Sequence, residues 1–303
     1  MTFTSFAQME AYIRERGLVK RVALACAHDE DALRAVVHAR NQGIITPILI
    51  GKEPEIRALL TGWGEDDGAY RIIPQEDDRE AVALAVRMCR EGEADLPMKG
   101  LMHTATFMKG ILDKEKGLIR PGELLSQATV LEVPEMGKLM VISDVAVNIN
   151  PDVEQKIKII RNAVALARSL GIDEPKIALL SALEVVNPKI PSTVDAAEIV
   201  ERLKNEYCIG GPFALDNAVS VEAARHKGID HPAAGRADIL IVPDLWSGNI
   251  FTKGLTFFGH MASAGTLNGL TRAVIMTSRT DTPENKYNSI LTCVVQSEYL
   301  ASL

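Results

Sequence analysis

Short runs of apolar, often β-branched residues alternate along the chain with longer segments whose apolar residues recur every three or four positions. The short runs predict buried strands and the longer segments predict amphipathic helices. The predicted strands of the first third are Arg21–Ala27, Thr46–Ile50, Tyr70–Ile73 and Met98–Met102. The helices that follow them are Asp29–Asn41, Glu53–Leu60, Asp78–Arg90 and Thr104–Leu112. Because such helices are long enough to connect parallel strands, the pattern predicts an α/β fold with a largely parallel sheet.

The alternation is interrupted once. Two strand-like runs, Gln127–Val133 and Lys138–Ile142, are joined only by the sequence PEMG, which predicts an antiparallel hairpin and a crossing between two lobes. The later predicted strands are Lys176–Leu180, Ile239–Val242 and Ala273–Met276, and the later helices are Asp152–Leu170, Val194–Leu203 and Pro283–Leu300.

Composition narrows the class of protein. The 303 residues are 47% apolar and 24% charged, which excludes a disordered or fibrous chain. A net charge of −7 argues against nucleic-acid binding. No apolar run approaches the ~20 residues of a membrane helix, and the first residues mix acids and bases, unlike a secretion signal. The four cysteines are far apart, so we expect a reduced, cytoplasmic protein with neither a nucleic-acid nor a membrane partner.

Several segments carry polar residues that packing alone does not require. At a strand-to-helix junction, Thr104 either opens an anion-binding helix start or caps the helix. After the hairpin, Asp144 and Asn148 either orient a ligand or fix a turn. Asp216 follows a Gly-Gly-Pro sequence, which indicates either a close ligand or a tight turn.

Two further segments follow apolar strands and are therefore expected at the carboxyl edge of a sheet, where ligands of α/β proteins bind. One contains Asn249. The other contains Ser278, Arg279 and Asp281, and its hydroxyl and guanidinium suit the oxygens of a phosphate, although a surface salt bridge is the alternative for the arginine.

Familiar motifs are missing. The sequence contains no GxxxxGK[ST], no GxGxxG after its first strand, no GxSxG and no HExxH or His/Cys cluster. We therefore expect no metal and no tightly bound cofactor.

Taken in order, these segments resemble the phosphate acyltransferase family, which comprises phosphotransacetylases and phosphotransbutyrylases. The resemblance extends from about Val22 to Ile290 and is carried by GGPFALDNAVS, PAAGRADILIVPDLWSGNIFTKGL and TSR. It implies a two-lobed α/β/α fold related to the isocitrate and isopropylmalate dehydrogenases. Residues 1–135 with 271–303 would build one lobe and residues 136–270 the other, with the active-site cleft between them.

The resemblance also implies a reaction, acyl-CoA + phosphate ⇌ acyl phosphate + CoA, by direct transfer. Ser278 and Arg279 match the family's Ser-Arg motif, which would hold phosphate. The family's base is an Asp shortly downstream; Ser289 aligns with it here, and Asp281 is the nearby Asp that would serve instead. Lys109 occupies the place where acetyl-specific members carry Arg.

Residues Ser181–Ala196 (SALEVVNPKIPSTVDA) resemble the butyryl-type branch, so a butyryl-type enzyme is favoured. The alternatives are a phosphate acetyltransferase and a non-catalytic, regulatory acyl-CoA-binding module; a decarboxylating dehydrogenase lacks its acidic metal cluster here. The substrates would be acyl-CoA and phosphate, and the protein is expected to be a homo-oligomer, at least a dimer.

Overall fold

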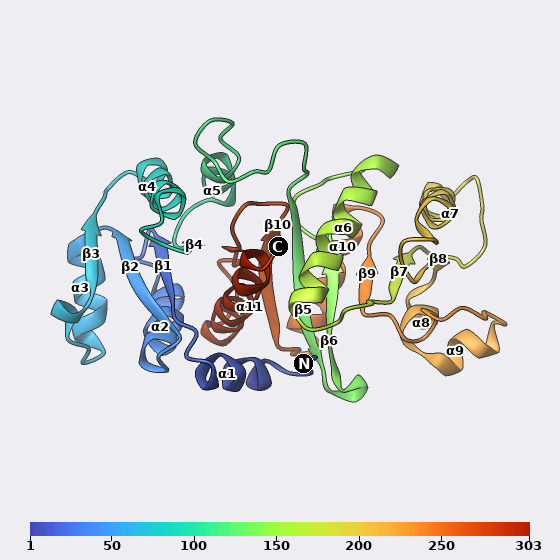
Figure 1. Cartoon of the computed structure of the whole chain (residues 1–303), viewed down its shortest axis with the longest axis horizontal. Helices are drawn as coiled ribbons and strands as arrows, with labels where there is room; N and C mark the ends of the chain where they lie inside the picture. Colours follow the sequence, from blue (N-terminus) through green and yellow to red (C-terminus); the bar gives the residue numbers. More distant parts are fainter. The chain divides into compact units, whose positions relative to one another are not determined.

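The computed structural model describes all 303 residues, which form two compact units (Figure 1). The terminal unit comprises Phe6–Glu123 and Ala264–Leu303, and the central unit comprises Met1–Ser5 and Leu124–Ser263. The first boundary therefore falls at 123/124, whereas the sequence interpretation placed it at 135/136. The physical reason is that strand β5 (Ser126–Val133) pairs along its whole length with β6 (Lys138–Ser143) and so belongs with the central unit.

The terminal unit is built on a mainly parallel sheet. Its strands lie in the order β3-β2-β1-β4-β11-β10, and only β10 runs antiparallel to its neighbour β11. The strands are β1 (Lys20–Ala25), β2 (Ile45–Gly51), β3 (Arg71–Pro74), β4 (Leu96–Lys99), β10 (Ser263–Asn268) and β11 (Val274–Ile275). Almost all side chains of β1, β2 and β4 are buried, as expected for parallel strands with helices on both faces.

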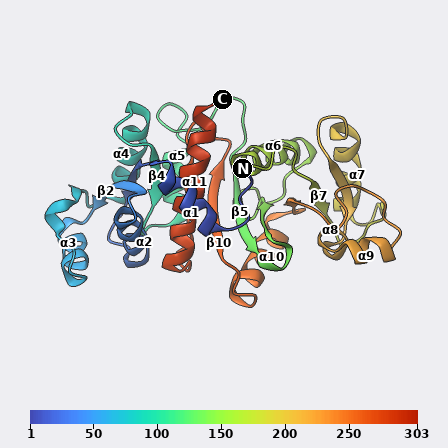
Figure 2. The ribbon, with the colours of Figure 1, turned by 60° about the horizontal axis from the view of Figure 1, so that its bottom comes forward.

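Helices cover this sheet on both sides. They are α1 (Phe6–Glu15), α2 (Glu30–Asn41), α3 (Glu53–Gly62), α4 (Asp78–Glu91), α5 (Thr104–Ile111) and α11 (Pro283–Ala301). Right-handed crossovers place α2 and α3 on one face, and the reversal of strand order between β3 and β4 places α4 on the other. Helix α11 packs between α1 and α2 (Figure 2), while α5 packs against α4.

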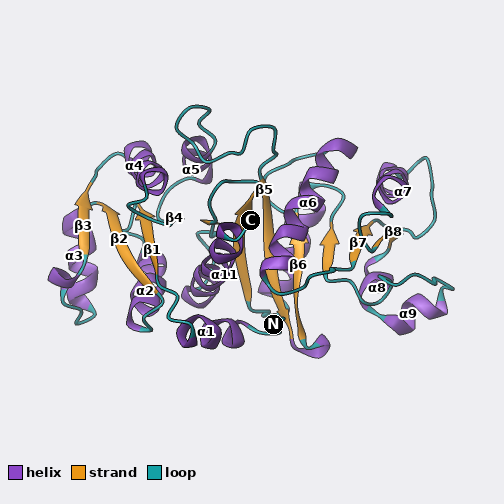
Figure 3. Ribbon diagram, viewed as in Figure 1, coloured by secondary structure: helices purple, strands orange, loops and turns teal.

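The strands of the central unit lie in the order β5-β6-β9-β7-β8 (Figure 3). The strands not yet given are β7 (Ile177–Leu180), β8 (Ile209–Phe213) and β9 (Ile239–Ile241). The helices are α6 (Val153–Ser169), α7 (Pro191–Leu203), α8 (Leu215–Val219), α9 (Val221–His226) and α10 (Leu245–Phe257). Met140, Ile142 and Leu240 share one apolar cluster with residues of α8, α9 and α10, so these helices cover one face of the sheet.

The predicted hairpin is confirmed. Strands β5 and β6 pair antiparallel from Ala128↔Ser143 to Val133↔Lys138. The connection is a single 3₁₀ turn, Pro134–Met136, closed by Gly137 in the left-handed region at φ 61°. The long helix after the hairpin is also confirmed, and Asp152 with Gln155 forms a reciprocal capping box at its start.

Two segments that the sequence interpretation treated as loops are regular structure. Ile209–Phe213 is strand β8, and its glycines are required by packing. A Cβ at Gly210 would lie 2.7 Å from His231 Nδ1, and one at Gly211 would lie 2.8 Å from Leu179 Cβ. Leu245–Phe257 is helix α10, capped by Asp244, whose side chain accepts the Ser247 N–H. Strand β10 and helices α1, α8 and α9 were not predicted either, whereas the predicted strands and helices form at or near their expected positions.

None of the helices combines the length and apolar content that crossing a bilayer requires.

Candidate active site

A short loop after β11 carries the Ser-Arg pair to the carboxyl edge of the terminal sheet. In this Ser-Arg loop, Thr277–Thr282, Ser278 and Arg279 are exposed. The Ser278 N–H donates to Asp281 Oδ2 at 2.6 Å, and Ser278 Oγ lies 3.1 Å from Thr280 Oγ1. Asp281 therefore holds the turn closed and leaves the Ser278 hydroxyl and the Arg279 guanidinium accessible. A hydroxyl and a guanidinium so presented suit the oxygens of an anion.

Two lysines lie buried behind this loop. Lys286, in the first turn of α11, is 1% exposed, and its Nζ donates to the Ser278 carbonyl oxygen at 2.9 Å. Lys99, the last residue of β4, is 2% exposed, and its Nζ donates to the Gly100 carbonyl oxygen at 3.3 Å. Burial lowers the pKa of Lys99, and the charges of Lys286 and Arg279 lower it further. The charge of Asp29 acts in the opposite direction and raises it. The carboxyl edge of this sheet therefore brings together the cationic side chains Lys99, Lys286 and Arg279, with Asp29 and Asp281 nearby.

Sequence reasoning missed both lysines. The one available signal for Lys99 is that a charged residue ends the apolar run Leu96-Pro97-Met98. Lys286 gives no such signal, because α11 is buried along most of its length, polar positions included.

Ser289, which aligns with the family's base, is a packing residue in this structure. It is fully buried on α11, where its hydroxyl accepts the Gly265 N–H at 2.9 Å and donates to the Asn285 carbonyl at 2.8 Å. A hydroxyl engaged in this way ties α11 to β10.

The start of α5 remains open. The cap position is His103 rather than Thr104, and no side chain accepts a hydrogen bond from the first N–H groups. Thr104 and Lys109 are both exposed. The simple explanation that Thr104 is an N-cap is therefore wrong, and the helix start keeps its capacity to meet an anion.

In the central unit, Asp144 fixes the turn after β6. Its carboxylate accepts the backbone N–H groups of Ala146, Val147 and Asn148 at 2.9–3.1 Å, and also the side-chain amide of Asn148. Burial raises the pKa of Asp144 in spite of these hydrogen bonds. Asn249 of α10 reaches the same loop through the Val145 carbonyl at 3.3 Å. These three predicted residues thus lie together, and their contacts favour the structural alternative.

Asp216 lies apart from that loop, on the surface. Its carboxylate is 3.2 Å from Lys227 Nζ, and this bond lowers the pKa of Asp216. Lys227 is in turn 3.5 Å from Glu184. The neighbour Asn217, not Asp216, is the buried residue. The structure thus gives Asp216 an exposed ion pair.

The cysteines are poor nucleophiles. Burial raises the pKa of all four thiols, to about 12 for Cys89, and Cys26 additionally donates to Asp78 at 3.2 Å. Because only a thiolate attacks an acyl group, acyl-enzyme chemistry on cysteine is disfavoured.

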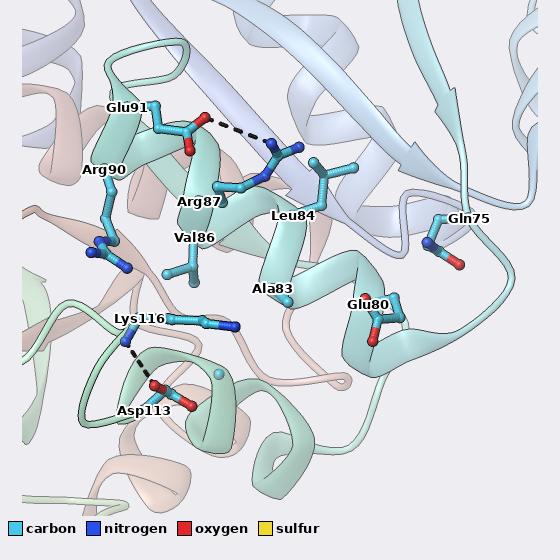
Figure 4. A pocket seen from close by; sticks show the side chains of 11 residues that line it. Gln75, Glu80, Ala83, Leu84, Val86, Arg87, Arg90, Glu91, Asp113 and Lys116 are labelled. Carbon is cyan, nitrogen blue, oxygen red and sulfur yellow. Dashed lines mark hydrogen bonds and ion pairs between the residues drawn. The ribbon is translucent and has the colours of Figure 1, made fainter.

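A groove of ≈ 760 Å³ runs between α4 and the segment after α5 (Figure 4). Its charged lining consists of three basic and three acidic side chains: Arg87, Arg90, Lys116, Glu80, Glu91 and Asp113. None of the predicted site residues lines it. Its balanced charge is poorly suited to a polyanion such as CoA.

Comparison with known proteins identifies the family of this chain. The family model described as phosphate acetyl/butaryl transferase matches residues 73–294. A phosphate butyryltransferase of Clostridium acetobutylicum is 41% identical over 90% of this chain and 91% of its own. A phosphate acetyltransferase of Thermotoga maritima is 40% identical over 91% of this chain and 94% of its own.

Solved structures similar to this chain include members of the same family. A branched-chain phosphotransacylase from Enterococcus faecalis superimposes with a TM-score of 0.81 at 32% identity, covering 92% of this chain and 99% of its own. A 4-hydroxythreonine-4-phosphate dehydrogenase from Burkholderia phymatum shares the fold alone, with a TM-score of 0.52 at 13% identity over 93% of this chain and 98% of its own. The expected relation to dehydrogenase-like folds is thereby confirmed. The family model matches well over half of this chain, and the chain therefore belongs to the phosphate acetyl/butyryl transferase family.

Proposed function

We propose that the protein catalyses the reversible transfer of a short-chain acyl group between CoA and inorganic phosphate. The observation that carries this proposal is the Ser-Arg loop, which presents a hydroxyl and a guanidinium at a sheet edge backed by two buried ammonium groups. Relatives of almost the same length and about 40% identity are named phosphate butyryl- and acetyltransferases.

The transfer is a direct substitution at the acyl carbonyl. Ser278 and Arg279 hold the phosphoryl group and stabilise the charge that develops on it. A base removes the proton of the CoA thiol, which ionises only near pH 8.5 unaided. The sulfur then bonds to the carbonyl carbon, and the bond from that carbon to the phosphate oxygen breaks, so that phosphate leaves with the electron pair. The reverse reaction follows the same steps backwards.

We propose Asp281 as the base, since its carboxylate is fixed beside Ser278. Thr104 and Lys109 are retained as proposed substrate ligands because their side chains are exposed at the start and on the surface of α5. Asp144, Asn148 and Asn249 of the central unit are also retained as proposed substrate ligands, and their contacts hold one loop in place.

The two relatives named for different acyl groups are almost equally similar to this chain, so their identities do not distinguish between acyl groups. The resemblance of Ser181–Ala196 to the butyryl-type branch therefore decides the proposal, and the favoured acyl group is of the butyryl type. A thiol-release assay with phosphate and a series of acetyl-, propionyl-, butyryl- and isobutyryl-CoA tests this. We expect the highest kcat/KM with butyryl-CoA. Preference for acetyl-CoA would identify a phosphate acetyltransferase, and binding without turnover of any acyl-CoA would identify a regulatory module.

We expect activity to survive EDTA and to need no nicotinamide cofactor. The positive charge at the proposed phosphate site is supplied by Arg279, Lys99 and Lys286, and no group of three or more His, Cys, Asp or Glu residues is arranged to hold a metal. The measurement is turnover before and after chelation. Loss of activity that a divalent metal restores would contradict the mechanism.

We further propose that the protein is a homodimer, in a reducing, cytoplasmic location. The support for the location is four free cysteines. The support for the dimer is α10, whose outer face carries Trp246, Ile250 and Phe257 at helical spacing, with Ile250 72% exposed. The helix contains no acidic residue, so two copies of this face can meet without like-charge repulsion between carboxylates.

Replacing Ile250 and Phe257 together with Asp should convert the dimer to a monomer. Each introduced carboxylate would have to be desolvated in the interface, opposite its symmetry-related copy. Light scattering coupled to size exclusion gives the mass directly. The control is Val185→Asp, which changes an equally exposed apolar side chain on the loop after β7. A double variant that keeps the wild-type mass would place the interface elsewhere.

A further inference from the structure

Lys99 and Lys286 are buried without the partner that a buried cation normally has. Neither ammonium forms an ion pair, and each makes its one hydrogen bond to a backbone carbonyl. Lys156 of α6 is a useful contrast, because it is also buried, at 6% exposed, but its Nζ lies 2.7 Å from Asp195. Leaving a buried ammonium uncompensated is costly, so groups of this kind are characteristic of functional sites.

The fold brings these two charges to one place. Strand β11 pairs with β4 at Ile275↔Met98, so the end of β4 and the beginning of the Ser-Arg loop lie at the same edge of the sheet. Helix α11 packs against both strands and inserts Lys286 behind the loop. In keeping with this placement, the charges of Lys286 and Arg279 lower the pKa of Lys99, and those of Asp29 and Asp281 raise it.

Two carboxylates belong to the same surroundings, and both are engaged with backbone amides. Asp29 accepts the Ala32 N–H at 3.0 Å as the cap of α2, and Asp281 accepts the Ser278 N–H. Three cations therefore stand against two carboxylates, whose charges oppose that of Lys99 only in part. The cluster carries an excess of positive charge in a region of low dielectric, where a charge acts strongly over a distance.

We propose that Lys99 and Lys286 are positioning residues for phosphate, in a cluster that keeps an excess of positive charge until the anion binds at the Ser-Arg loop. Lys286 fixes the loop through the Ser278 carbonyl. Lys99, at the end of β4, provides a second positive charge to balance that of the bound phosphate. Neither ammonium is exposed, so both act through the loop and through their field rather than as direct ligands. The identity of the anion as a substrate rests on the proposed function.

Lys99→Met is the decisive variant, because it replaces the ammonium with an apolar side chain of similar length. Its Tm without ligand should equal or exceed that of the wild type, since an unpaired buried charge is removed. The increase in Tm that inorganic phosphate produces in the wild type should be lost. The KM for phosphate should rise on the order of 10- to 100-fold, as for loss of a charged partner, with a smaller change in kcat.

Lys286→Met should weaken the binding of phosphate in the same way as Lys99→Met. Lys286→Arg keeps the charge and should restore part of the affinity for phosphate. Lys156→Met is the matched control in the central unit. It leaves Asp195 without its partner, so its Tm should fall while the Tm increase caused by phosphate stays as in the wild type.

A lowered Tm for Lys99→Met with an unchanged phosphate response would show a purely structural lysine and overturn the proposal. A wild-type protein that phosphate does not stabilise would overturn it as well. The Tm measurement uses phosphate against chloride at equal ionic strength, without acyl-CoA, so it is independent of turnover. A phosphate response that depends on Lys99, in a protein that transfers no acyl group, would refute the proposed function and leave this inference standing.

Discussion

Replacing Arg279 with Ala should reduce kcat/KM for acyl transfer by about 10²–10³-fold, the loss typical of one electrostatic donor at a site where charge develops. The guanidinium is exposed at the tip of the Ser-Arg loop, and its removal should leave the folded structure intact. The KM for phosphate should rise as well, because the same group holds the bound anion. Steady-state kinetics in both directions, with a Tm measurement for folding, give the result.

Two further variants sharpen this test. Arg279→Lys keeps the charge but loses the planar fork of donors, and its activity should lie between those of the wild type and the Ala variant. Arg87→Ala removes an exposed arginine of α4 that takes no part in the proposed chemistry, and it should leave activity unchanged. A folded Arg279→Ala protein with turnover close to wild type would rule out the role assigned to this residue.

The second large effect is expected for Asp281→Asn. If the carboxylate removes the thiol proton, kcat should fall by about 10²–10⁴-fold while the KM values change little, because only proton transfer is lost. An Asn oxygen still accepts the Ser278 N–H, so the closed turn is preserved. The variant thus separates the base from the element that holds the loop.

The opposite result is equally informative. An increased KM for phosphate with intact kcat would show that Asp281 only orients the Ser-Arg loop. Asp144 would then be the next candidate for the base, because burial raises the pKa of its carboxyl group. Its Asn variant would be measured in the same assay.

Local patterns predicted the elements whose stability comes from their own sequence. The alternation of apolar periods predicted most strands and helices, and PEMG between two apolar runs predicted the hairpin at the residues where it forms. The Ser-Arg pair was correctly expected after a terminal strand, at a carboxyl edge, since that placement follows from a parallel sheet alone.

Strands β8 and β10 were missed because their residues are small or polar. Ser263–Asn268 forms a strand only because it pairs with β11, and Ile209–Phe213 because its glycines allow β8 close contact with its neighbours. Long-range pairing of this kind outweighs local propensity.

For the candidate site, the sequence by itself determined the residue types that can hold phosphate, Ser278 and Arg279, and their order along the chain. Tertiary structure alone decided which polar residues are buried. It sealed Ser289 against β10, placed Asp216 in a surface ion pair, and buried Lys99 and Lys286 behind the Ser-Arg loop. The physical reason is that the burial of a side chain depends on which helices and strands pack together, and residues distant in sequence determine that packing. Burial in turn determines how strongly a charge interacts with its neighbours.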